Sequence, residues 1–153
     1  MTPKILVANG PNLDLLGQRE VSVYGSASLA DLEAQLKQEA ARLAPLFGFE
    51  SIDLSFFQSN DESAMCAQLD RSWDGILLNP AAWTHTSVAI ADRLLAKSHK
   101  YVEVHISNVY RREDFRRHSF TAAHAVCVVT GAGFLGYNAG LYAICQKIST
   151  STN

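Results

Sequence analysis

A glutamate and a histidine lie two positions apart in the stretch Tyr101-Val-Glu-Val-His-Ile-Ser-Asn108. The first half of this stretch is apolar and β-branched enough to form a buried strand. Residues two apart in a strand point to the same face, so Glu103 is expected beside His105. A carboxylate next to an imidazole fixes its tautomer and stabilises its protonated form. The pair could act as a general acid, or it could be a buried polar pair whose members satisfy each other.

The residues that follow favour the chemical interpretation. Ser107 and Asn108 come at the predicted strand end, and Arg112 and Arg116 lie four positions apart, on one face if that segment is helical. An acid, a hydroxyl, an amide and two guanidiniums so close together indicate a site for a polar, anionic small molecule.

Composition limits the class of protein. The chain has 153 residues, a net charge of −2 and a hydrophobic fraction of 48%, which predicts a single domain at 1–148 and a disordered polar tail at 149–153. This charge indicates neither nucleic acid nor a membrane as a partner, and no apolar run is long enough to span a bilayer. The three cysteines lie in apolar surroundings, as is typical of reduced thiols in a cytoplasmic protein. The five histidines form no H-x-x-x-H pair, so no metal site is expected.

Alternating strand and helix patterns must position these residues. Strands are expected at 4–8, 49–56, 75–78, from 101, and at 126–129, and helices at 29–43, 62–71, from Thr84 or Thr86 to 97, and at 135–148. The connection from 18 to 28 is long for a compact domain, which is typical of a lid. Five alternations with several wholly apolar strands predict a flavodoxin-like, three-layer α/β fold. Its five-stranded parallel sheet would have helices on both faces.

In such sheets ligands bind beyond the carboxyl ends of the strands. Asn12, Asn79 and the segment 105–107 all fall at or just past predicted strand ends, so they converge on one rim. Taken alone, the turns at 9–12 and 79–80 could be no more than tight turns. No lysine is expected at this rim, which argues against an imine with a carbonyl substrate. Proton transfer therefore remains the expected chemistry, with His105, His85, Tyr24 and the carboxylates as candidates.

A series of motifs in order along nearly the whole chain resembles those of type II 3-dehydroquinate dehydratases. The motifs are Asn9-Gly-Pro-Asn-Leu13, Leu15-Leu-Gly17, Arg19-Glu20, Tyr24-Gly25, Phe57-Gln-Ser-Asn60, Leu78-Asn-Pro80, Thr84-His-Thr-Ser87, Glu103-Val-His-Ile-Ser-Asn108 and Arg112-Glu-Asp-Phe-Arg116 with His118-Ser119. The resemblance implies a flavodoxin-like lyase with no cofactor or metal, assembled as a dodecamer of four trimers. It also implies dehydration of 3-dehydroquinate to 3-dehydroshikimate, in the shikimate pathway of aromatic amino acid biosynthesis or in quinate breakdown.

The same resemblance implies catalytic roles. Tyr24 is the base that removes a proton from C2, with Arg19 beside it on the lid. Asn12 holds a water that stabilises the enolate oxygen. His105, oriented by Glu103, protonates the leaving C1 hydroxyl.

Binding roles follow in the same way. The resemblance implies that a further group of residues holds the substrate: Asn79, Ile106 and Ser107 the carboxylate, His85 and Arg116 the ring hydroxyls, Arg112 the site and its base, and Asp92 from a neighbouring subunit. Asp14, Val21, Asp61 and Ala81-Ala82-Trp83 depart from the commonest family pattern without removing any of these groups.

Two other classes of function compete with the enzyme. A flavodoxin-like module could bind a small anion without catalysis, but it would need no base paired with an acid. A flavin-binding electron carrier would need a phosphate loop, and the turn at 9–12 lacks the glycine pattern of one.

Overall fold

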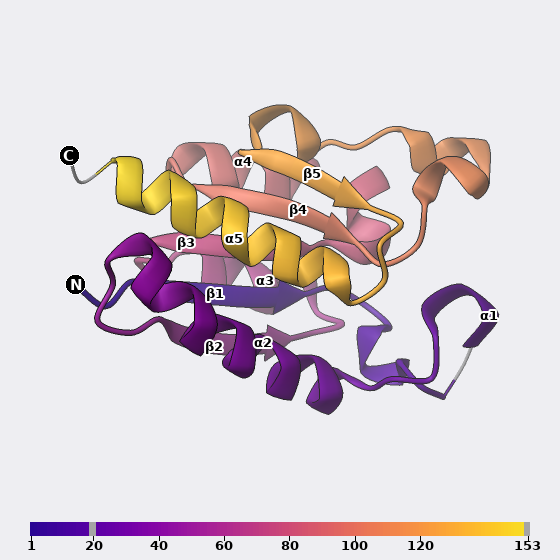
Figure 1. Cartoon of the computed structure of the whole chain (residues 1–153). Helices are drawn as coiled ribbons and strands as arrows, with labels where there is room; N and C mark the ends of the chain where they lie inside the picture. The colour runs from indigo at the N-terminus through magenta and orange to yellow at the C-terminus, as the bar shows by residue number, and fades with distance from the viewer. Residues whose placement is uncertain (19–20, 152–153) are drawn as a thin grey trace.

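The computed structural model describes residues 1–18 and 21–151, with only the backbone described at Val21 and Tyr24. Within these residues five parallel strands form one sheet in the order β2-β1-β3-β4-β5 (Figure 1). The strands are β1 (Lys4–Asn9), β2 (Asp53–Gln58), β3 (Gly75–Asn79), β4 (Tyr101–His105) and β5 (Cys127–Thr130). The strand order confirms the predicted flavodoxin-like fold.

Helices cover both faces of this sheet. In Figure 1, α2 (Leu29–Leu43) and α5 (Leu135–Thr150) lie on the near face, whereas α3 (Glu62–Leu69) and α4 (Val88–Ala96) lie behind. The N-terminus and the end of α5 lie at the amino ends of the strands (Figure 1). The opposite rim carries α1 (Val21–Tyr24) and short 3-10 turns, among them η1 (Leu13–Leu15), η3 (Ala81–His85), η4 (Val109–Arg111) and η5 (Asp114–Arg117).

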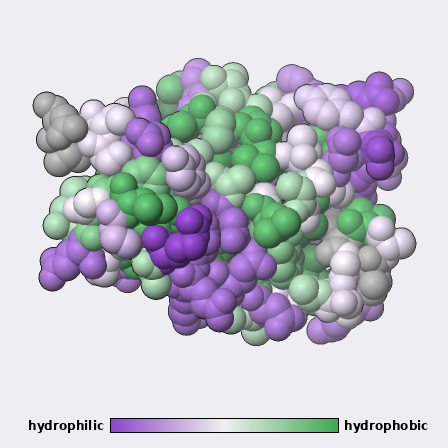
Figure 2. Space-filling view, viewed as in Figure 1, coloured by the Kyte–Doolittle hydropathy of each residue, from purple (hydrophilic) through white to green (hydrophobic). Residues whose placement is uncertain are grey.

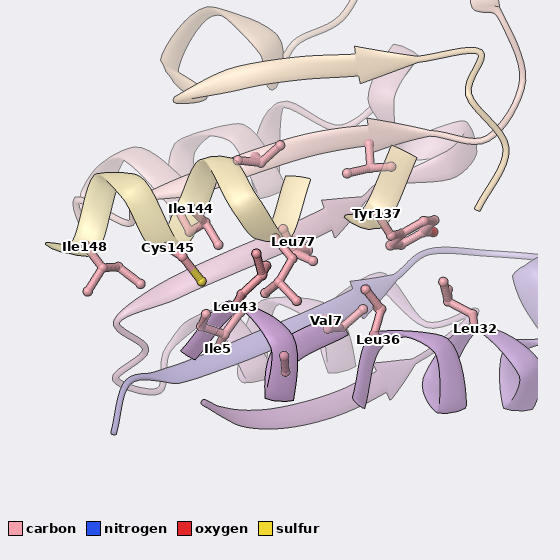
Figure 3. Packing of buried hydrophobic residues seen from close by; sticks show 14 of the residues in the cluster. Ile5, Val7, Leu32, Leu36, Leu43, Leu77, Tyr137, Ile144, Cys145 and Ile148 are labelled. Atoms are coloured by element: carbon pink, nitrogen blue, oxygen red, sulfur yellow. The ribbon is translucent and has the colours of Figure 1, made fainter. Parts of the chain in front are cut away.

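The central strands are apolar because both of their faces are buried. Successive side chains of β1 alternate between two cores: Ile5 and Val7 pack with the α2–α5 layer, and Leu6 packs with the α3–α4 layer. Figure 3 shows the first core, in which Leu36 of α2 and Tyr137 of α5 face the sheet. The same alternation directs odd-numbered residues at the ends of β1 and β3 toward α5.

The boundaries of α2 follow the sequence signals closely. Ser28 and Asp31 form a reciprocal capping box, in which the Ser28 side chain accepts from Asp31 N and the Asp31 carboxylate accepts from Ser28 N. After α2 the chain continues as η2 (Ala44–Phe47), which ends at Gly48 with φ 70°. Phe49 N still donates to Ala44 O, at 2.9 Å. The sequence pattern predicted that the next strand begins at 49, but in the structure it begins at Asp53.

Two other predicted boundaries were wrong. The helix expected from Thr84 or Thr86 begins only at Val88, because the Ser87 hydroxyl caps it by accepting from Ile90 N at 3.0 Å. The tail was expected to be disordered from 149, but residues 149 and 150 are the last two of α5, which runs to Thr150. Its serine and threonine hydroxyls donate to carbonyls of the preceding turn, with Thr150 Oγ1 3.1 Å from Gln146 O. Residues 152–153 of that predicted tail lie outside the described residues.

The outer surface of the α2–α5 layer mixes polar and apolar areas (Figure 2). Exposed apolar side chains here include Leu46 of η2 and Tyr142 of α5. Among the described residues, no helix has both the length and the apolar character needed to cross a bilayer.

Candidate active site

A cleft of about 130 Å³ opens at the carboxyl ends of the strands, where ligands of such sheets bind. It lies where the strand order reverses, between the turns that follow β1 and β3. Eight residues that the sequence analysis singled out line this cleft: Asn12, Asn79, His85, His105, Ile106, Ser107, Arg112 and Arg116. The structure thus brings together residues spread over about a hundred positions of the chain.

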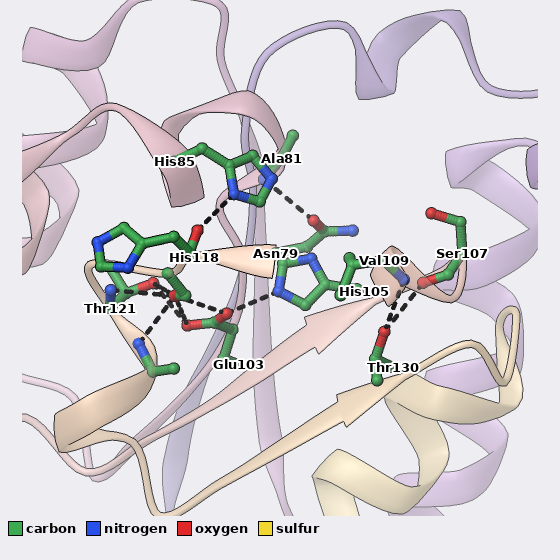
Figure 4. Close-up of polar contacts among 12 residues, drawn as sticks. Asn79, Ala81, His85, Glu103, His105, Ser107, Val109, His118, Thr121 and Thr130 are labelled. Atoms are coloured by element: carbon green, nitrogen blue, oxygen red, sulfur yellow. Dashed lines mark hydrogen bonds and ion pairs between the residues drawn. The ribbon is translucent and has the colours of Figure 1, made fainter. Parts of the chain in front are cut away.

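Glu103 lies behind His105 and completes the predicted pair. Its carboxylate accepts a hydrogen bond from His105 Nε2 at 2.6 Å (Figure 4). The bond assigns the proton to Nε2 and leaves Nδ1 as the nitrogen available to the cleft. Glu103 is 1% exposed and His105 is 7% exposed, so the pair is shielded from water on all sides but the cleft.

Two hydroxyl groups that sequence reasoning gave no role complete the surroundings of Glu103. Ser119 Oγ lies 3.0 and 3.1 Å from the two carboxylate oxygens, and Thr121 Oγ1 donates to Oε2 at 2.5 Å. Burial raises the pKa of Glu103, but the bonds from His105, Thr121 and Ser119 outweigh this effect and hold the pKa below its ordinary value. Glu103 therefore stays ionised at neutral pH, with its carboxylate against the His105 ring.

The two arginines line the cleft, although the segment between them is not the helix that the sequence analysis considered. The chain makes two separate 3-10 turns, η4 and η5, with Arg112 in an extended conformation between them. Glu113 orients Arg116 through a 2.7 Å ion pair to Nε and lies 3.8 Å from Arg112 Nε. Arg112 and Arg116 thus place two guanidinium groups on this wall of the cleft, and guanidinium groups suit an anionic ligand.

His85 is held as a neutral imidazole with a defined tautomer. Its Nδ1 lies 2.7 Å from the carbonyl oxygen of His118, which can only accept, so Nδ1 carries the proton (Figure 4). Burial lowers the pKa of His85, and the nearby charge of Arg116 lowers it further. At neutral pH Nε2 is therefore an acceptor, suited to a ligand hydroxyl group.

Asn12 has a left-handed backbone with φ 67°, which asparagine tolerates better than most residues. Its N–H donates to Asn60 Oδ1 at 2.8 Å, and Gln58 Nε2 donates to the same oxygen and to the carbonyl of Gly10. A side chain at Gly10 would lie 2.4 Å from Pro80 O, so glycine allows the two turns to pack against each other. The turn at 9–12 is thus part of the cleft wall as well as a tight turn.

The ends of β4 and β3 are also anchored by hydrogen bonds. Thr130 Oγ1 donates to Ser107 O at 3.0 Å, and Gly133 N donates to Ile106 O at 3.0 Å. Beside β3, Ala81 N donates to Asn79 Oδ1, and Ala81 has φ 51°, a conformation that favours glycine. Ala81 is one of the departures from the family pattern, and it lines the cleft.

Asp92 is not among the described residues that line the cleft. Asp92 is exposed on α4. Arg19 and the side chain of Tyr24 lie outside the described part of the structure. At the base of their loop, however, Gly17 has φ 83°, and a side chain there would lie 2.8 Å from Ser26 O. The two ends of the loop therefore meet, immediately after Leu15 and Leu16 of the cleft wall.

No lysine belongs to the cleft lining in the described part of the chain. Lys4 is the first residue of β1 and Lys100 precedes β4, so both lie at the other end of the sheet. Within 1–18 and 21–151, no group of three or more His, Cys, Asp or Glu side chains is arranged to hold a metal ion.

Comparison with known proteins gives a consistent result. Residues 3–145 match the family model described as "Dehydroquinase class II". A catabolic 3-dehydroquinase of Verticillium alfalfae is 49% identical over 92% of this chain and 91% of its own length, and a 3-dehydroquinate dehydratase of Bacillus cereus is 45% identical over 95% and 97%. The crystal structure of a type II dehydroquinase from Butyrivibrio crossotus superposes with a TM-score of 0.85 at 37% identity, covering 94% of this chain and 97% of that one. The chain therefore belongs to the class II dehydroquinase family.

Proposed function

We propose that this chain removes water from 3-dehydroquinate to form 3-dehydroshikimate, in the shikimate pathway or in quinate breakdown. The observation that carries the proposal is the buried Glu103–His105 pair at a cleft with Arg112 and Arg116 on its wall. An imidazole beside an ionised carboxylate can donate a proton to a leaving hydroxyl group. The guanidiniums suit the carboxylate-bearing substrate.

The first step needs a base and a stabilised oxyanion. The ketone at C3 acidifies the C2–H bond, so a base can take that proton if the enolate oxygen is stabilised. We assign the base to Tyr24, assisted by Arg19, and assign Asn12 to a water that hydrogen-bonds the enolate. The approach of Gly17 to Ser26 supports the assignment of Tyr24 and Arg19, because the loop that contains these two residues begins and ends beside the cleft.

The second step needs an acid. The enolate electrons reform the C3 carbonyl and make the C1–C2 double bond, while the C1–O bond breaks. His105 gives its proton to the departing oxygen, which leaves as water. Glu103 supports this step because its negative charge stabilises the imidazolium before transfer.

The other polar groups hold the substrate in place. We assign the carboxylate to Asn79, Ile106 and Ser107, at the ends of β3 and β4. His85 and Arg116 are assigned to ring hydroxyl groups. The neutral tautomer of His85 supports this assignment, because its Nε2 can accept a hydrogen bond from a hydroxyl group. Arg112 is assigned to the site as a whole and to stabilisation of the base.

The direct test is absorbance at the enone band of the product. Addition of the purified protein to 3-dehydroquinate is expected to raise this absorbance with time, because dehydration conjugates the new double bond with the ketone. His105→Asn protein at the same concentration is the matched control and should raise it far more slowly. No absorbance increase with the wild-type protein would contradict the proposed function.

A second measurement separates this mechanism from one that uses an imine. Borohydride with substrate is expected to leave the protein active and its mass unchanged, because no lysine is assigned to the cleft. Mass spectrometry after peptide digestion checks the result. A reduced substrate adduct on any lysine would contradict elimination through a free enolate.

We also propose that the protein assembles as trimers, four of which form a dodecamer, and that Asp92 completes the site of a neighbouring subunit. Val88, Asp92 and Leu95 lie at helical spacing on α4, opposite its buried residues Ile90 and Leu94. Val88 and Leu95 are 51% and 54% exposed in the single chain, which supports contact between this face and another copy.

Asp92→Ala is expected to lower kcat/KM by at least about tenfold while the particle remains a multiple of three chains on light scattering, because a charged substrate contact contributes about 1.5–3 kcal/mol. Glu33→Ala, which removes an exposed carboxylate of α2, is the matched control and should retain activity. A fully active monomer would contradict both the assembly and the role of Asp92.

A further inference from the structure

Three polar side chains meet inside the α2–α5 core, immediately behind the cleft. Asn9 and Asn79 end the neighbouring strands β1 and β3, where they pair in register. Tyr137 reaches them from the first turn of α5 (Figure 3). They are 3%, 4% and 0% exposed, respectively, and Tyr137 was given no role by the sequence.

The hydrogen bonds among them can run in only one direction. Ala81 N is a backbone donor, so the Asn79 atom that it contacts at 3.1 Å must be the carbonyl oxygen Oδ1. Asn79 Nδ2 therefore faces Tyr137 Oη, at 2.9 Å, and donates to it. The hydroxyl proton of Tyr137 is then directed to Asn9 Oδ1, at 2.6 Å. Each group in this chain determines the orientation of the next.

This arrangement determines what Asn79 can offer to a ligand. Nδ2 carries two hydrogens, and Tyr137 accepts one, so the other remains on an amide that lines the cleft. A flipped amide would direct Oδ1 to Tyr137 and leave the Ala81 N–H without its acceptor. Burial raises the pKa of Tyr137, so its hydroxyl group stays protonated at every pH at which the enzyme would work.

We propose that Tyr137 is a positioning residue for substrate binding, since its hydroxyl group holds the Asn79 amide with an N–H donor directed at the substrate carboxylate. Tyr137 acts through Asn79 and does not itself belong to the cleft lining. The inference rests on the proposed function for the identity of the ligand. The orientation of the amide rests on the hydrogen bonds alone.

Tyr137→Phe is expected to raise KM for 3-dehydroquinate about five- to tenfold, the effect of loosening one hydrogen bond to a charged group. The contact with the carboxylate contributes equally to binding of the ground state and of the transition state, so kcat should stay within about twofold of the wild-type value. Ile144→Val, a core substitution about two turns further along α5, is the matched control for lost packing and should leave KM unchanged. Should Tyr137→Phe fold poorly, Asn9→Ala removes the acceptor of the same hydroxyl group and should raise KM in the same direction.

A double-variant cycle tests whether Tyr137 acts through Asn79. In an Asn79→Ala background, Tyr137→Phe should raise KM no further. An equal rise in both backgrounds, or an unchanged KM in active Tyr137→Phe protein, would overturn the inference.

A spectroscopic readout is independent of turnover. In the Tyr137→Phe variant the side-chain amide protons of Asn79, followed by NMR, should exchange with water faster than in the wild type and in Ile144→Val. Unchanged exchange would overturn the inference. If wild-type protein did not dehydrate 3-dehydroquinate, the proposed function would fail, and this measurement would still decide the role of Tyr137.

Discussion

Replacement of His105 by asparagine is expected to lower kcat about 10²–10⁴-fold, the usual contribution of a general acid. Asparagine can still hydrogen-bond Glu103, so the buried carboxylate keeps a partner and the fold should persist. What is lost is a group that can transfer a proton to the leaving hydroxyl. Steady-state kinetics with 3-dehydroquinate measures the effect.

Binding and a matched histidine separate catalysis from structure. A substrate-like anion should still bind the His105→Asn variant by calorimetry, because Asn79 and the arginines are unchanged. His99 is the matched control: it is partly buried and hydrogen-bonded to Leu69 O, but it lies at the other end of the sheet, so His99→Asn should keep its kcat. Near-normal turnover by the His105 variant would mean that the pair is structural. Glu103→Gln should reproduce part of the loss, since an amide stabilises the imidazolium less than a carboxylate does.

Tyr24→Phe and Arg19→Ala should each lower kcat strongly, and the double variant should be little worse than either one. An ordinary tyrosine has a pKa of about 10, and each unit of lowering requires about 1.4 kcal/mol of preferential interaction with the anion. A guanidinium group in a site closed to water can supply that interaction. Groups that act as one unit show such non-additive losses, which the four sets of kinetic constants would reveal.

The same proposal requires the loop to close over the substrate. Protease should cut the free enzyme between Gln18 and Gly25, and a substrate-like inhibitor should protect it.

The matched control for the Tyr24→Phe kinetics is Tyr110→Phe, which also removes a phenol hydroxyl group. Tyr110 is exposed on η4, outside the cleft lining. If the losses at Arg19 and Tyr24 multiplied, or if Tyr24→Phe turned over normally, the base would lie elsewhere, with His85 as the next candidate.

Much of the fold could be predicted because its signals are local. The contact between Glu103 and His105 follows from the two-residue period of a strand, and the start of α2 follows from Ser28 and Asp31. The alternation of apolar strands with helices predicted the parallel sheet and the rim that holds the cleft. The roles of Arg19 and Tyr24 and the assembly came from resemblance to a family, and they stay predictions.

Local signals were insufficient where neighbouring residues compete for one role. Thr84, Thr86 and Ser87 can all cap a helix, but in the folded chain Thr84 lies within η3 and Ser87 caps α4. The arginines at 112 and 116 would share one face if their segment were helical, yet two 3-10 turns bring both to the cleft. In each case the sequence determined the residue types, and the tertiary contacts determined the backbone between them.

The surroundings of the site were decided by tertiary structure alone. Ser119 and Thr121 reach Glu103 across 16 and 18 residues, and Tyr137 reaches Asn9 across 128. No spacing rule links such positions, because they meet only when the loop after η5 covers β4 and when α5 packs on β3 and β4. A buried carboxylate or amide must still find hydrogen-bond partners, and which partners it finds depends on the fold around it.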